Sequence, residues 1–273
     1  MALEPTTVTA GSFTVAQAAQ SLSMSVSSAP PWYTNESYVI YVSYSSNQSA
    51  PTVYTTGFSP TVIVSYANGQ SQTLVASATM QVGPWGSQGS AAISWTPLWN
   101  YQASLYATYG GVSSNTATGQ VYAPTTFTGV SVSPTVVSPG ASVSVVAMLE
   151  YYVNGSWNAL PNATVTYAVT GPSGTVAQGT AVTGSNGEVS IALQAPTQPG
   201  SYTVTLAFSP SSFDGSLGSL LPSSVSIALQ VGQEVSSATS FLSKYGKWIL
   251  VGVAVAAAAG IVLYEYSRHH RSS

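Results

Sequence analysis

The chain lacks cysteine altogether, and it has no lysine, arginine or histidine before Lys244. Charged residues make up 4% of its 273 residues, against about 25% in an ordinary soluble protein. Without cysteine, disulfides cannot hold an exported body together, so each domain must be stable through its own core. Without cations, the body has no partner for phosphate, and this excludes nucleic-acid binding.

The same shortage of titratable side chains argues against an enzyme. A Ser-His-Asp triad needs histidine, a zinc site needs histidine or cysteine, and a calcium site needs clustered carboxylates. The acids of the body are scattered along the chain: Glu4, Glu36, Glu150, Glu188, Asp214 and Glu234. We therefore expect no catalytic residues, no metal and no cofactor. A carboxylate pair for glycoside hydrolysis could in principle form from Glu150 and Glu188.

A body with so few ionisable groups would change its charge little in acid. At pH 2–3 most of its carboxyls would be protonated, and no cations would remain to repel one another. This composition fits an extracellular protein of an acidic habitat, with a glycosylated surface protein at neutral pH as the alternative. Sequons for N-glycosylation occur at Asn35, Asn47, Asn154 and Asn162.

The four basic residues flank one apolar run near the C-terminus, Trp248–Tyr264, which has no charge. The run predicts a single transmembrane helix over residues 248–266, long enough for a hydrocarbon core of about 30 Å. Aromatic and basic residues at both ends fit the membrane interfaces. The interface residues are Tyr245, Lys247, Trp248, Tyr264, Tyr266 and Arg268. A buried helix of a soluble domain is the alternative.

The basic residues flank the helix equally, so orientation follows from the body, which is easy to translocate. We expect the N-terminal body to be extracellular and residues 267–273 to be cytoplasmic. The first residues show no signal peptide, so either a signal has been removed or the protein is tail-anchored. Gly252, Ala256 and Gly260 form a small-residue stripe that would let the helix self-associate or dock on another membrane subunit.

The body is predicted to be all-β, because short runs of Val, Thr, Tyr and Ser alternate with period two between Gly, Pro and Asn. Residues 1–124 would form a first sandwich, with a hairpin turn at Asn68-Gly69. Residues 125–232 would form a second, with strands near 127–133, 142–152, 163–169, 175–182, 188–194, 201–208 and 224–231. Residues 233–247 are a short juxtamembrane segment that could be helical.

The late part of the second unit carries a resemblance. Thr183–Val189, then Ala195-Pro196, then Pro199–Val204 resemble the late strands of invasin-type and macroglobulin-type immunoglobulin-like surface modules. This resemblance implies tandem immunoglobulin-like sandwiches. The layout is also similar to that of the membrane-anchored small S-layer subunit of acidophilic archaea, although the long coiled-coil stalk of that family is missing.

Aromatic residues are the best candidates for recognition. Trp32, Trp85 and Trp99 lie near turn residues, where they could bind sugars or anchor a protein interface, or else fill the core. The loop 209–222 places leucines where they could cover a sandwich edge or dock on a partner. We expect a structural envelope protein that assembles with lattice or envelope proteins. The alternatives are an adhesin that binds carbohydrate or cells, an accessory subunit of a membrane machine, and a virus-surface protein.

Overall fold

A computed structural model describes residues 19–210 and 217–232 of the chain. These residues form β-strands and no α-helix, which confirms the all-β prediction for this part of the chain. No helix long and apolar enough to cross a membrane occurs among them. The predicted membrane helix 248–266, the juxtamembrane segment 233–247 and the tail 267–273 lie outside the described residues.

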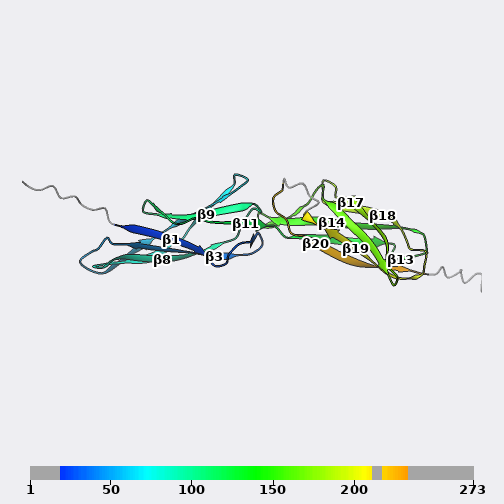
Figure 1. Ribbon diagram of the computed structural model, residues 1–273, viewed down its shortest axis with the longest axis horizontal. Coiled ribbons are helices and arrows are strands. Elements are labelled where there is room, and N and C mark those ends of the chain that lie inside the picture. Colours follow the sequence, from blue (N-terminus) through cyan, green and yellow to red (C-terminus); the bar gives the residue numbers. More distant parts are fainter. Residues whose placement is uncertain (1–18, 211–216, 233–273) are drawn as a thin grey trace, which may run out of the picture.

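The described residues form two β-sandwiches that follow one another end to end (Figure 1). The first sandwich packs a sheet of order β1-β3-β8-β7-β4 on a sheet of order β2-β11-β9-β5-β6, with β10 paired to β9. Its strands are β1 (Gln20–Val26), β2 (Trp32–Tyr33), β3 (Tyr38–Ser46), β4 (Tyr54–Phe58), β5 (Thr61–Tyr66), β6 (Ser71–Val75), β7 (Ala78–Gly83), β8 (Gly86–Trp95), β9 (Gln102–Tyr109), β10 (Val112–Ser113) and β11 (Ala117–Tyr122).

The second sandwich has a smaller first sheet. In it, β14 pairs with β12 on one side and with β15 and β18 on the other, while the opposing sheet has the order β13-β20-β19-β16-β17. Its strands are β12 (Thr125–Ser133), β13 (Val136–Val137), β14 (Ser142–Val153), β15 (Ser156–Ala159), β16 (Thr164–Gly171), β17 (Gly174–Val182), β18 (Glu188–Gln194), β19 (Gly200–Phe208) and β20 (Ser223–Val231).

The two sandwiches share one topology. The order β12-β14-β18 corresponds to β1-β3-β8, and β13-β20-β19-β16-β17 corresponds to β2-β11-β9-β5-β6. In each sandwich a short second strand leaves the first sheet and pairs in parallel with the last strand of the other sheet. This is the two-sheet arrangement of immunoglobulin-like sandwiches. The first sandwich differs by adding β7 and β4 beyond β8.

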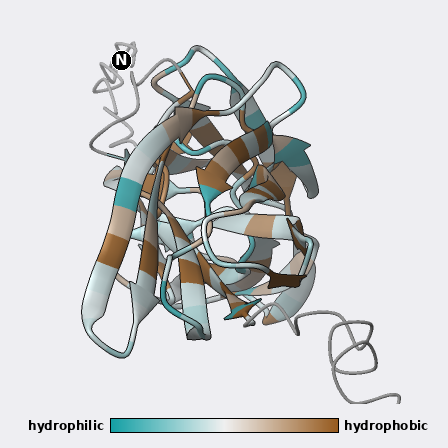
Figure 2. Cartoon of the chain, turned by 90° about the vertical axis from the view of Figure 1, so that its right-hand side faces the viewer, coloured by the Kyte–Doolittle hydropathy of each residue, from teal (hydrophilic) through white to brown (hydrophobic). Residues whose placement is uncertain are grey.

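Strict alternation explains the strands. Along β3, the side chains of Tyr38, Ile40, Val42 and Tyr44 are buried, while most of the residues between them are exposed. Figure 2, which views the second sandwich from its outer end, shows apolar and polar bands alternating along the strands. Each sheet therefore has one apolar face, and burying that face requires a second sheet opposite it.

The two cores differ in composition. The first is aromatic: Trp32 and Trp95 meet edge to face with ring centroids 5.1 Å apart. Phe58 and Tyr109 do the same at 4.7 Å. The second core is mainly aliphatic, with Val145, Leu149, Val165 and other small residues fully buried. Large rings fill the wider first sandwich, where both sheets have five or more strands.

Candidate functional site

The charged side chains among residues 19–210 and 217–232 do not form a reactive centre. Glu36 Oε2 accepts a hydrogen bond from Tyr38 Oη at 3.0 Å, and Glu150 Oε2 accepts one from Thr128 Oγ1 at 2.7 Å. Glu188 of β18 pairs with Met148 of β14, two residues before Glu150. No group of three or more His, Cys, Asp or Glu residues occurs within the described part of the chain. The candidate sites are therefore surfaces, not pockets with reactive groups.

One surface lies at the free end of the first sandwich, and we call Val53, Tyr54 and Trp85 the tip patch. Trp85 is 99% exposed, Val53 71% and Tyr54 50%. Val53 and Tyr54 follow the loop that contains Ala50, and Trp85 lies in the turn after Gly83. These two segments are adjacent, because Ala50 N donates to Gly83 O at 3.1 Å. The turn after Trp85 lies against Ser46, next to the start of β1. The tip patch is thus at the end where the described chain begins, opposite the end where it leaves β20 (Figure 1).

The three tryptophans proposed for recognition have three different environments. Trp85 is exposed at the tip. Trp32 is 1% exposed, because β2 carries it between the two sheets, so the structure removes it from the recognition aromatics. Trp99 is partly buried and packs edge to face on Tyr66 with ring centroids 5.2 Å apart. The sequence shows all three beside turn residues, and the burial of Trp32 depends on pairing with the distant β11.

The structure also shows an exposed aromatic pair that the sequence did not single out. Trp157 is 45% exposed on β15 and meets Tyr152 of β14 edge to face, with ring centroids 5.3 Å apart. The hairpin of β14 and β15 turns at Asn154-Gly155. The sequence signal that could have found this pair is the short run after the turn, which contains Trp157. The alternation of its residues alone did not predict a strand.

The junction between the sandwiches is built on Asn100, which is 1% exposed. Its side-chain Nδ2 donates to Leu217 O at 2.8 Å and to Ser219 O at 2.9 Å. In return, Ser219 N donates to Asn100 O at 2.7 Å. Residues 217–219, in the described part of the loop whose leucines were expected to cover an edge or dock on a partner, thus bond to the first sandwich. Leu220 is buried and bridges Ala123 of the linker.

Two further contacts join the sandwiches away from Asn100. Thr34 Oγ1 donates to Tyr152 O at 2.5 Å, and Asn154 N donates to Leu98 O at 2.8 Å. Three sets of hydrogen bonds from separate loops therefore cross one junction. A single linker would leave a hinge, whereas several hydrogen bonds in different places oppose bending.

Two tyrosines beside the first core have perturbed acidity. Burial raises the pKa of Tyr66 to about 12, and its hydroxyl donates to Gln72 Oε1. Burial also raises the pKa of Tyr38 to about 12, and the carboxylate of Glu36 adds to the shift. Both phenols serve as hydrogen-bond groups in the fold: Tyr38 Oη also accepts from Tyr33 N at 2.8 Å.

All four sequon asparagines, Asn35, Asn47, Asn154 and Asn162, are exposed. Asn47 follows β3 at the tip, and Asn154 lies in the turn at the junction. Exposure meets the steric requirement for a glycan, so glycosylation stays a prediction at each position. The membrane-helix and interface residues predicted from the sequence lie outside the described residues.

No protein-family model matches the chain, and no curated protein matches it either. Among solved structures it is similar to the D0-D1 domain of intimin, with 15% identity over 71% of this chain and 90% of that chain and a TM-score of 0.28. A tetra-tandem repeat in the extending region of a large adhesion protein matches with 18% identity over 78% of this chain and 50% of that chain, at a TM-score of 0.33. Adhesin InvE of Yersinia pseudotuberculosis matches with 14% identity, coverage of 80% and 63%, and a TM-score of 0.28. Such low TM-scores support no conclusion about function, and the fold assignment rests on the strand order.

Proposed function

We propose that the chain is a non-enzymatic structural protein of the cell envelope. Its body is extracellular, the helix 248–266 anchors it in the membrane, and residues 267–273 are cytoplasmic. The two sandwiches act as a spacer that holds the tip patch away from the membrane. There it assembles with a surface-layer protein or another large envelope complex.

The observation that carries this proposal is the exposure of Trp85 at the end of the molecule opposite the C-terminal exit. A fully exposed tryptophan costs solvation free energy in a free protein, and tryptophan is enriched among the residues that dominate protein interfaces. Val53 and Tyr54 beside it enlarge the apolar area. The hydrogen-bonded junction supports the spacer role, because it would keep the tip at a fixed distance from the anchor.

The composition suggests what the partner is like. A surface with so few charges offers almost no electrostatic steering and few salt bridges, so the interface would depend on apolar contact and neutral hydrogen bonds. Such an interface would change little between neutral and acid pH. A similarly charge-poor lattice protein of an acidic habitat fits this description, as in the S-layer arrangement that the layout resembles.

Co-purification from the source membranes tests the proposal. The full-length chain, Trp85→Ala and Trp157→Ala are extracted in mild detergent, and mass spectrometry identifies co-purified proteins and any glycans at the four sequons. We expect a dominant, repetitive, charge-poor partner with the wild type and with Trp157→Ala, the control for an exposed tryptophan elsewhere, and its loss with Trp85→Ala. Equal recovery of the partner with Trp85→Ala would contradict the proposal.

A second candidate is an adhesin that binds carbohydrate. Trp85 and the Tyr152–Trp157 pair both offer exposed rings that can stack on sugars. Glycan-array binding that falls on substitution of either tryptophan, with no protein partner in the pull-down, would favour this role. Co-purification with multi-span membrane subunits would instead favour an accessory subunit, and recovery in virus particles would favour a virus-surface protein.

A further inference from the structure

Among the described residues, strand β18 is paired along one edge only. It pairs with β14 alone, from Ser142↔Gln194 to Met148↔Glu188. The hydrogen bonds at the two ends of this pairing show which residues of β18 direct their backbone groups to β14. Leu149 N donates to Gly187 O at 2.9 Å, and Ala195 N donates to Ala141 O at 2.8 Å. The odd-numbered residues of β18 therefore bond to β14, and the backbone groups of the even-numbered residues point to the other edge.

The backbone N–H and C=O groups along this edge belong to three even-numbered residues, Ser190, Ala192 and Gln194. Within the described part of the chain, no strand pairs with it. The backbone of Glu188, the remaining even residue, is already bonded within the turn: its N donates to Asn186 Oδ1 at 3.1 Å, and its O accepts from Gly184 N at 2.8 Å. The available groups thus begin at Ser190 and continue to the end of the strand.

The first sandwich shows how this edge is closed when it is occupied. There, β8 corresponds to β18, and β7 pairs with its first half, from Gly83↔Gly86 to Met80↔Gly89. At the end of β8, Gln72 of β6 bonds to Thr96 O through Nε2 at 3.2 Å and accepts from Trp95 Nε1 through Oε1 at 3.2 Å. The second sandwich has no counterpart of β7, because residues 183–187 connect β17 directly to β18.

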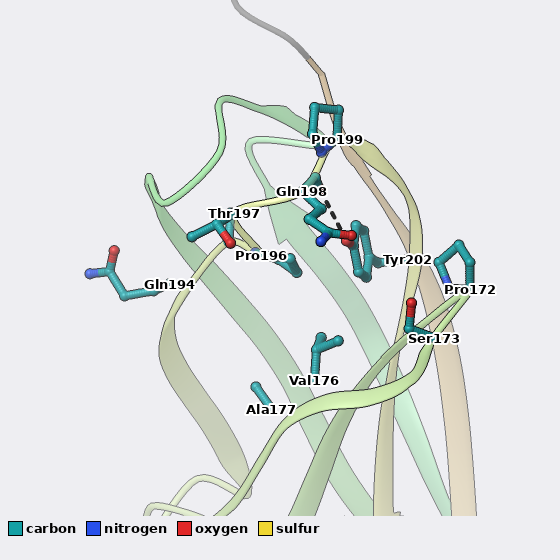
Figure 3. A pocket seen from close by; sticks show the side chains of 11 residues that line it. Pro172, Ser173, Val176, Ala177, Gln194, Pro196, Thr197, Gln198, Pro199 and Tyr202 are labelled. Atoms are coloured by element: carbon teal, nitrogen blue, oxygen red, sulfur yellow. Dashed lines mark hydrogen bonds between the residues drawn. The ribbon is translucent and has the colours of Figure 1, made fainter.

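A pocket of about 520 Å³ opens at the end of the free edge, where Gln194 is the one edge residue that lines it. Figure 3 shows Val176 and Ala177 of β17 low in the view, Pro196 and Thr197 above them, and Tyr202 to the right. The Tyr202 hydroxyl donates to Gln198 O at 2.9 Å, so its polar group is satisfied and its ring is left as an apolar wall. Val176 is 47% exposed at the mouth of the pocket.

We propose that β18 accepts an extended strand from a partner protein, which adds to the sheet beyond β18 and places the side chains at one of its ends in this pocket. Strand addition provides main-chain hydrogen bonds for affinity and side-chain pockets for specificity. The edge also lacks the usual protection against such pairing, since β17 and β18 contain no proline or lysine, and Glu188 is their one charged residue.

The chemistry of the edge defines the occupant. Every residue that lines the pocket is uncharged, so an incoming charge would lose its hydration without gaining a partner. The occupant is therefore an uncharged segment with small or aliphatic side chains at alternate positions. Strand β7 is an example of this pattern in the same chain: Ala78, Met80 and Val82 face inward, and residues 78–83 carry no charge.

The test uses an acetylated and amidated peptide of residues 77–83 (SATMQVG) with the full-length chain. Hydrogen exchange is followed at the backbone amides of Ser190, Ala192 and Gln194. We expect the peptide to slow exchange at these amides by roughly tenfold or more at saturation. The amides of Val189 and Ile191, which already bond to β14, should change little.

Two variants at one position separate strand addition from nonspecific binding. Ala192→Pro removes an outward N–H that β14 does not use, which an edge strand tolerates. We expect it to weaken binding by roughly tenfold or more, while Ala192→Thr, which keeps the N–H, binds as the wild type does. Val176→Arg should also abolish binding, because it places a charge at the pocket. Protected amides at Val189 and Ile191 show that each variant is folded.

Absence of protection at millimolar peptide, or equal binding by Ala192→Pro and the wild type, would overturn the proposal. Protection without peptide in a sample that sediments as a dimer would overturn it in favour of a second copy as occupant. Binding of a peptide of residues 1–18 in place of the test peptide would overturn it in favour of the chain's own N-terminal segment. None of these results bears on the tip patch, so the proposed envelope function is tested separately.

Discussion

Asn100 and Ser219 hydrogen-bond each other in both directions. Ser219 N donates to Asn100 O at 2.7 Å, and Asn100 Nδ2 donates to Ser219 O at 2.9 Å. The two residues are 119 positions apart and belong to different sandwiches. These two hydrogen bonds link the two sandwiches without any charged group. Such neutral bonds explain how a protein with so few charges can fix the relative position of its parts.

Replacement of Asn100 should loosen the junction. Asn100→Ala removes both side-chain donors, so Leu217 O loses its bond while Ser219 O keeps the one from Ala123 N, and we expect a cost of about 1–3 kcal/mol. Small-angle scattering of the full-length chain should show a broader range of distances than for the wild type. Asn115→Ala is the control, because Asn115 bonds to Met24 N at 2.9 Å and Met24 O at 3.0 Å inside the first sandwich. A scattering curve unchanged by Asn100→Ala would contradict a rigid junction.

Gly218 should tolerate no side chain. Its φ is +80°, and a Cβ there would lie 2.6 Å from Asn100 O. Gly69 in the hairpin turn has a φ of +85° with open space around it. Both alanine substitutions incur the left-handed backbone cost of roughly 1–2 kcal/mol, and only Gly218→Ala adds a clash. Denaturant unfolding should therefore show a larger loss for Gly218→Ala than for Gly69→Ala, and equal losses would show that the contact with Asn100 is not tight.

Trp32 and Trp85 should differ in what their loss affects. Trp32→Ala empties a core position and should destabilise the first sandwich by about 3–5 kcal/mol. Trp85→Ala removes an exposed ring and should change the free energy of unfolding by about 0.5 kcal/mol or less. Thermal or denaturant unfolding measures both. A large loss of stability for Trp85→Ala would mean that this tryptophan supports the fold, and the tip patch would lose its main residue.

Alkaline pH should destabilise the first sandwich through Tyr66. Burial raises its pKa to about 12 from 10.0. Between about pH 10 and pH 12 the unfolded state therefore binds fewer protons than the folded state, and stability falls as pH rises through this window. Tyr38, with a pKa also raised to about 12, contributes in the same direction.

Unfolding measured at several pH values checks this. Tyr66→Phe should be less stable than the wild type below pH 10, because the bond to Gln72 is lost, but its stability should fall less between pH 10 and pH 12. Tyr41→Phe, which removes a half-exposed phenol, controls for the substitution itself. Parallel pH curves for Tyr66→Phe and the wild type would contradict the assignment.

Local alternation predicted most of the second sandwich. The strands expected at 142–152 and 188–194 correspond to β14 and β18, and the turn at Asn68-Gly69 joins β5 to β6 in the first sandwich. These elements are specified by side chains of neighbouring residues, so a sequence window contains the information. The strands β4 and β7 were not predicted, because Gly57 and polar residues interrupt their alternation. In the structure β4 pairs with β7, and β7 also pairs with β8.

The sequence by itself determined the chemistry of this protein. A body without cysteine cannot form disulfides wherever its residues lie, because composition does not change on folding, and its lack of cations is the basis of our expectation that it binds no nucleic acid. The tertiary structure decided which groups are accessible. Trp32 and Trp85 have similar turn-rich neighbourhoods, but pairing with β11 buries one, and the described part of the chain leaves the other exposed. The same reason applies to the bond between Asn100 and Ser219 and to the free edge of β18: long-range pairing creates or leaves open each of them, and no local pattern encodes it.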